Sequence, residues 1–268
     1  MNIERLKKIL EYSKNNQVEI FSMVRRFFSF SGLDSDNDVL NILQIVRSSF
    51  RKKGYLVLEM PLRDKEIGAL TYKGEGLGYV VVNTTLPKVN VNFALAHEIY
   101  HVFFQTSEFV SKVEFANDHY FEHEEEFAAN LFAGMLLMPE TGFRKMFRKF
   151  YEETNGAEID TLICLMTYYE VPYMSVLIRC YELGLLSTSP VSKELLDTSG
   201  EMVSQKVREL WLDEDVLKPS LKNDYEHMEA VVQQFGKDYI EKEYINERTL
   251  RKVIANMRKL YGEIKGDA

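Results

Sequence analysis

The spacing of apolar residues divides the chain into helical ends and a short β-rich segment. In the first fifty residues, apolar side chains recur every three or four positions, as at Leu6, Ile9 and Leu10 and again at Val24 and Phe27. This spacing predicts amphipathic helices. The polar stretch "SGLDSDND" is typical of a loop. We expect one of its acidic residues to cap the helix that follows, "VLNILQIVRSSFRKKG".

The hydrophobic period changes after these helices. Three short segments rich in β-branched and aromatic residues follow at 54–60, 68–72 and 78–83, and "KGEGLG" before the last one is typical of a turn. These segments predict a small, mainly antiparallel three-stranded sheet.

Helical spacing then returns and continues to the end of the chain. One helix is predicted from about Asn92 to about Phe104, and a second from Glu124 to Leu137, where Pro139 stops it. Two further helices are expected in "IDTLICLMTYYEVPYMSVLIRCYELGLL", with a break at "EVP", and residues 201–262 are again helical in pattern.

The fold class predicted from these patterns is α+β and mostly helical. The polar stretch "STSPVSKELLDTSG" has the composition of a linker. We therefore divide the chain into residues 1–188, with the N-terminal helices and the sheet, and residues 189–268, a helical C-terminal region whose role the pattern does not indicate.

Composition and targeting signals indicate a cytoplasmic protein without a membrane partner. The chain is 46% hydrophobic and 28% charged, which is ordinary for a soluble globular protein. The first residues interleave charges with apolar positions, unlike a signal peptide, and runs such as "LFAGMLLM" are too short to span a bilayer. Cys164 and Cys180 lie in apolar, helix-like sequence and are interpreted as buried thiols.

The charge distribution argues against direct binding of nucleic acid. The net charge is -8, although residues 1–53 carry ten Lys or Arg against six Asp or Glu. A solvated helix surface explains this excess most simply, and a DNA-binding regulator that uses these basic helices stays open as an alternative. The helix pair at 160–186 is superficially similar to a helix-turn-helix, but Arg179 is its only basic residue, which favours packing or substrate docking.

The stretch "AHEIYHVFF" contains the strongest chemical signal in the chain. On a helix, His97 and His101 share one face, so two imidazole nitrogens can bind one Zn²⁺. Glu98 lies beside that face and can act as a general base on water without binding the metal. This is the H-E-x-x-H arrangement of zinc peptidases. The alternative is a helix that merely packs two histidines, but unpaired polar groups in an apolar helix cost a few kcal/mol each.

A catalytic zinc ion needs a third protein ligand, and the next helix offers one. Glu126 lies three residues before Ala129 on the predicted inner face, and Asn130 follows four residues later, where its amide can steady a ligand. The alternative interpretation, an acidic first turn favoured by the helix dipole, fits the neighbouring residues Glu124 and Glu125. The same stretch also contains His119 and His123.

Together, "FALAHEIYHVFF" and "EFAANLFAGMLLMP" resemble the ImmA/IrrE family of metallopeptidases, whose pattern is F-x-x-A-H-E-x-x-H followed by E-x-x-A-N-x-F-A-x-x-L-L-M-P. The likeness covers about residues 50–186. It implies a zincin-like core and zinc held by His97, His101 and Glu126, with Glu98 as the base. Two departures are Tyr100, where the family commonly has Gly, and Ala128, where it often has a second Glu; neither removes a ligand.

The resemblance also implies a function, a zinc-dependent site-specific endopeptidase that cleaves a helix-turn-helix repressor of a mobile element or stress regulon. We expect Glu98 to take a proton from water and pass it to the leaving amine, and His119 or His123 to donate a hydrogen bond to the transition state. The strand at 78–83 is the candidate for binding the substrate backbone. The alternative function is a non-proteolytic zinc-containing regulatory protein that sequesters a repressor partner, and the intact Glu98 favours the peptidase. The sequence leaves the oligomeric state open.

Overall fold

The N-terminal part of the chain forms the two predicted helices. The structure is a computed structural model that describes residues 1–32, 41–73, 78–105, 124–187 and 191–265. Helix α1 (Ile3–Ser31) ends at Gly32, whose φ of 71° is the left-handed conformation that glycine adopts without strain. Helix α2 (Ile42–Lys52) is capped by Asn41, whose side chain accepts a hydrogen bond from the backbone N–H of Gln44. The expected acidic cap was wrong because the helix begins directly after this asparagine.

The sheet has three strands, as predicted, but it is mixed rather than mainly antiparallel. Strands β1 (Tyr55–Met60), β2 (Ala69–Lys73) and β3 (Gly78–Asn83) lie in the order β1-β3-β2. Strand β3 pairs parallel to β1 and antiparallel to β2. The reason lies in composition: β3 is almost wholly apolar and nearly all of it is buried, so it takes the central position between the two other strands.

The two faces of β3 belong to two separate hydrophobic cores. Val80 and Val82 pack into the main core with helices on one side of the sheet, whereas Val81 packs into a smaller core on the other side. The main core contains α3 (Lys88–Phe103) and α4 (Glu124–Leu137). Helix α4 has the predicted bounds, and α3 begins four residues before the predicted start, directly after Pro87.

Further helices extend the main core. They are α5 (Glu140–Glu153), α6 (Glu158–Tyr169), α7 (Tyr173–Glu182), α8 (Lys193–Leu196) and α9 (Gly200–Glu209). The predicted break between α6 and α7 is confirmed, with Glu170 in a left-handed conformation at φ 51° and Pro172 before α7. Both cysteines are buried, as expected. Leu195, Leu196 and Val203 belong to the main core, so side-chain packing crosses residue 188, and the division of the chain there stays a prediction.

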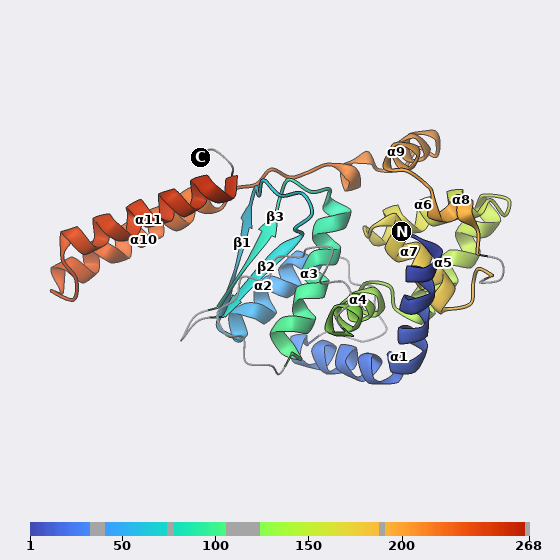
Figure 1. The fold of residues 1–268 in the computed structure, drawn as a ribbon, viewed down its shortest axis with the longest axis horizontal. Coiled ribbons are helices and arrows are strands. Elements are labelled where there is room, and N and C mark those ends of the chain that lie inside the picture. The colour runs from blue at the N-terminus through green and yellow to red at the C-terminus, as the bar shows by residue number, and fades with distance from the viewer. Residues whose placement is uncertain (33–40, 74–77, 106–123, 188–190, 266–268) are drawn as a thin grey trace.

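The C-terminal part crosses the sheet and then leaves it. After the short 3₁₀ helix η2 (Glu214–Leu217), residues 218–224 run past the ends of β1 and β3. There the backbone N–H of Asp224 donates to the carbonyl of Glu59 at 2.7 Å, and the hydroxyl of Thr84 donates to the carbonyl of Lys222 at 2.7 Å. Helices α10 (Tyr225–Glu241) and α11 (Glu247–Lys265) then form a paired arm that extends beyond β1 (Figure 1).

Within the part of the chain that the structure describes, no single helix is both long and apolar enough to cross a bilayer. Helices α6 and α7 meet that test only as a pair, with a bend of 109° between them.

Candidate metal centre

Two neighbouring helices bring the three predicted ligands together. Helix α3 presents His97 and His101 on one face, and the first turn of α4 presents Glu126 opposite them. One ligand atom from each residue lies within 4.8 Å of the others. Helices α3 and α4 pack closely because α4 carries the small, buried residues Ala129 and Ala133.

The spacing of these atoms suits a tetrahedral metal ion. The Nε2 atoms of His97 and His101 are 2.9 Å apart, and the carboxylate of Glu126 lies 3.3 Å from the first and 3.7 Å from the second. Ligand atoms about 2.0–2.1 Å from a tetrahedral zinc ion are about 3.3 Å from one another. One observed separation equals that value, one is shorter and one is longer, so the donor set fits zinc.

The outer ring nitrogens of both histidines contact side-chain amides. Nδ1 of His97 lies 3.1 Å from the amide oxygen of Asn130, and Nδ1 of His101 lies 2.6 Å from that of Gln105. An amide oxygen only accepts, so these contacts favour a proton on each Nδ1, which would leave each Nε2 with a lone pair for a metal ion. The amide nitrogen of Gln105 in turn donates to Glu125 at 2.7 Å, which links the end of α3 to the start of α4.

The charges around His97 favour its protonated form when no metal is present. Burial alone lowers the pKa of His97, but the hydrogen bond and the charge of Glu126, the charge of Glu98 and the hydrogen bond to Asn130 outweigh it, so the pKa is raised. The carboxylates that raise this pKa also make the site electrostatically suited to a divalent cation, whose charge they would offset.

Glu98 lies beside the cluster and is held by the sheet. Its side chain is buried, and the hydroxyl of Thr71 on β2 donates a hydrogen bond to its Oε2. Helix α3 packs against β2, which places the carboxylate between the metal cluster and the sheet. This arrangement holds a carboxylate next to the candidate metal site without including it in the three-residue cluster.

The comparisons with known proteins agree with this arrangement. Residues 50–181 match the family model Peptidase_M78, described as the IrrE N-terminal-like domain. This segment belongs to the Peptidase_M78 family. No curated protein matched the chain in a sequence comparison.

Membership in Peptidase_M78 confirms the resemblance to the ImmA/IrrE family and supports a metallopeptidase-type function in general. The sheet, α3 and α4 all lie inside the Peptidase_M78 segment. Helix α1 and helices α8 to α11 lie outside it.

The structure brings together His97, His101, Glu126 and Asn130 of the Peptidase_M78 domain as the sequence predicted. His119 and His123 lie outside the described residues, and their role stays a prediction. Arg179 is buried and paired with Glu182 at 3.0 Å, in keeping with the predicted packing role.

Sequence reasoning missed two residues that contact the Peptidase_M78 site. Gln105 follows His101 by four residues and lies just beyond the end of α3 at Phe103, so its distance along the chain from His101 was a usable signal for it. Thr71 gave no such signal, because its contact with Glu98 depends on how α3 packs against the sheet. The strand chosen for the substrate was also wrong, because β3 is central and both of its edges are already paired.

Proposed function

We propose that this chain is a zinc-dependent, site-specific endopeptidase that cleaves a helix-turn-helix repressor of a mobile element or stress regulon. The observation that carries the proposal is the convergence of His97, His101 and Glu126 beside Glu98, within a Peptidase_M78 segment. The general function, that of a metallopeptidase, is supported by the family match. The repressor as substrate comes from the resemblance described above.

His97, His101 and Glu126 would hold the zinc ion, with the two amide contacts fixing the imidazole tautomers. When bound, zinc would supply the Lewis acidity that activates water and polarises the scissile carbonyl. A storage site for zinc needs no base at its side, whereas a hydrolase does.

Glu98 is proposed as the general base. Its carboxylate accepts a proton from the attacking water and delivers it to the nitrogen of the leaving amine. The hydrogen bond from Thr71 leaves one carboxylate oxygen, Oε1, for that proton and restricts rotation of the carboxylate. Thr71 is therefore proposed to position the base without touching the substrate's reacting atoms.

The free edge of β2 is proposed to bind the substrate backbone. Among the described strands, β2 pairs only with β3. The N–H of Asn83 donates to the carbonyl of Gly68, so Gly68 faces β3 with its backbone polar groups. In an antiparallel pair every second residue does so, and Thr71, three residues further on, therefore turns its N–H and C=O away from β3. An added strand would pair with Thr71 there, next to the carboxylate that Thr71 holds.

The decisive experiment co-expresses the protein with the repressor encoded beside its gene and follows the repressor by immunoblot and mass spectrometry. Wild type is expected to give one defined cleavage, which Glu98→Gln abolishes while zinc content, measured by metal analysis, is unchanged. Glu124→Gln removes an exposed carboxylate from the same region and is expected to cleave normally.

One result would count against the proposed mechanism, and another against proteolysis itself. Cleavage that persists in Glu98→Gln would remove Glu98 as the base. Release of repression by both wild type and Glu98→Gln, with the repressor intact, would favour sequestration of the partner over proteolysis.

A further inference from the structure

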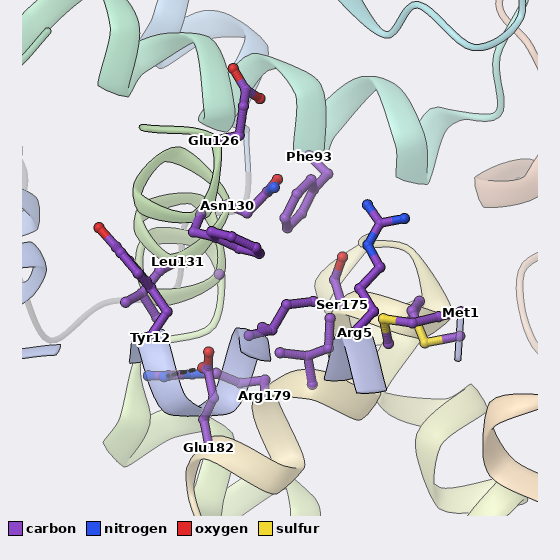
Figure 2. Close-up of a pocket in the computed structure, with 15 residues that line it drawn as sticks. Met1, Arg5, Tyr12, Phe93, Glu126, Asn130, Leu131, Ser175, Arg179 and Glu182 are labelled. Carbon is purple, nitrogen blue, oxygen red and sulfur yellow. Dashed lines mark hydrogen bonds and ion pairs between the residues drawn. The ribbon is translucent and has the colours of Figure 1, made fainter. Parts of the chain in front are cut away.

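A pocket of about 320 Å³ adjoins the candidate metal centre (Figure 2). It lies between α1, α4 and α7, and Phe93 of α3 completes its wall. Its lining includes Glu126 of the metal cluster and Asn130, whose amide oxygen contacts His97. A group bound in this pocket would therefore lie within one side chain of the metal ligands.

The pocket follows one face of α4. Glu126, Asn130 and Gly134 are spaced four residues apart, so they lie one above another along that face, and all three line the pocket. A Cβ added at Gly134 would meet no heavy atom within 4 Å. Glycine at position 134 therefore leaves open space in the pocket, at the opposite end of this α4 face from Glu126.

The remaining walls are mostly apolar. They include Ile9 and Tyr12 of α1, Phe93, Leu131 and Ile178. Phe93 and Asn130 both line the pocket, and Figure 2 shows them on the side towards Glu126.

The charged lining residues already have partners within the protein. Arg179 donates to the carbonyl of Met138 and pairs with Glu182 at 3.0 Å, and Arg5 also has a partner in the chain. Glu182 lies deep in the protein, where burial raises its pKa against the opposing effect of Arg179. A neutral, apolar occupant thus fits this pocket better than a charged one, which would compete with existing pairs.

We propose that this pocket binds a large apolar or aromatic side chain of the substrate, next to the bond that is cut. The proposal rests on the function proposed above and names the substrate feature that this chain selects. Helix α1, which supplies Ile9 and Tyr12, lies outside the Peptidase_M78 segment, so one wall of the specificity pocket comes from a part of the chain that the family match does not cover.

The first test compares two zinc-binding probes on zinc-loaded protein by calorimetry. Acetohydroxamate reaches only the metal, whereas 3-phenylpropanohydroxamate also carries a phenyl group long enough to enter the pocket. Wild type is expected to bind the phenyl compound at least about tenfold more tightly, because burial of a phenyl group contributes at least that factor.

Gly134→Leu is designed to fill the pocket. It is expected to reduce the ratio of the affinities for 3-phenylpropanohydroxamate and acetohydroxamate from about tenfold to less than about twofold. The affinity for acetohydroxamate itself should stay unchanged. Gly262→Leu is the matched control, since Gly262 is also helical with open space around its Cβ but lines no part of the pocket. Ile9→Phe narrows the pocket from α1, and a reduced ratio in this variant would show that α1 forms a wall.

A second test needs no metal and so separates this inference from the proposed function. Benzyl alcohol is titrated into metal-free protein, and NMR follows the methyl signals of three residues that line the pocket, Ile9, Met174 and Ile178. Saturable shifts that Gly134→Leu abolishes support the pocket even if the protein hydrolyses nothing. Equal affinities for both hydroxamates, or the absence of these methyl shifts in wild type, would overturn the proposal.

Discussion

The amide oxygen of Gln105 lies 2.6 Å from Nδ1 of His101. Through its amide nitrogen, Gln105 also donates to Glu125, the residue before the proposed ligand Glu126. One side chain therefore sets the direction of a ligand on α3 and ties it to the first turn of α4. This contact makes Gln105 a positioning residue for the metal centre.

Gln105→Ala is expected to weaken zinc binding about 10- to 100-fold, because His101 loses the acceptor that fixes its tautomer. Competition titration with a zinc-chelating dye measures this change. Gln205→Ala is the matched control, since Gln205 makes a similar hydrogen bond to Glu209 at 2.7 Å on α9, far from the metal in the fold. Unchanged zinc affinity in Gln105→Ala would show that the contact has no role in metal binding.

Thr71→Val is expected to lower kcat about tenfold or more on the cognate repressor, because the carboxylate of Glu98 loses the donor that orients it. Zinc affinity should stay at the wild-type value, since Thr71 touches no proposed ligand. Thr71→Ser keeps the hydroxyl and is expected to restore most of the activity. A rate in Thr71→Val equal to wild type would contradict this role.

Zinc is expected to stabilise the fold through its three proposed ligands, His97, His101 and Glu126. At a free zinc concentration of 100 times Kd, binding adds about 2.7 kcal/mol to the free energy of unfolding, and a chelator removes it. Thermal unfolding with and without zinc measures the shift. His97→Ala should abolish the shift, whereas His227→Ala, on α10, should preserve it.

Arg47→Met is expected to reduce the free energy of unfolding by about 1–3 kcal/mol. Arg47 lies 2.5 Å from the carboxylate of Glu59, whose side chain is only 8% exposed, so its loss leaves a buried charge less well paired. Urea unfolding provides the measurement. Arg251→Met removes an arginine from an exposed pair with Glu247 and should change stability by less than about 0.5 kcal/mol.

The α10–α11 arm is expected to lose stability in acid through Glu229. Hydrogen bonds from Arg258 and Tyr225 lower the pKa of Glu229 to about 2. Because its pKa in the folded state lies below the ordinary value of 4.5, this contribution is complete above pH 4.5 and disappears as the pH falls towards 2.

Carboxyl NMR should therefore place the Glu229 midpoint near 2 in wild type and clearly higher in Arg258→Met, where the hydrogen bond from Tyr225 still lowers it. The stability difference between these two proteins should shrink as the pH falls from 4.5 to 2. A Glu229 midpoint that does not move in Arg258→Met would refute the pairing as its cause.

Prediction from sequence succeeded where the signal was local and periodic. The bounds of α4 were predicted because its apolar positions repeat at helical spacing up to Pro139. The start of α3 was predicted too late, because Lys88 and Asn90 directly after Pro87 resemble the end of a loop. Strand positions were also predicted well, but their order was not, since a short apolar run carries no information about its neighbours.

The sequence by itself determined which residues can form the metal centre. His97 and His101 share a face because four residues make about one helical turn, and Asn130 follows Glu126 by the same interval. Only the tertiary structure decided that Thr71 holds Glu98, that Glu125 and Gln105 meet, and that α1 completes a pocket beside α4. These relationships join elements distant along the chain, so they depend on how helices and strands pack together, which no local spacing of residues specifies.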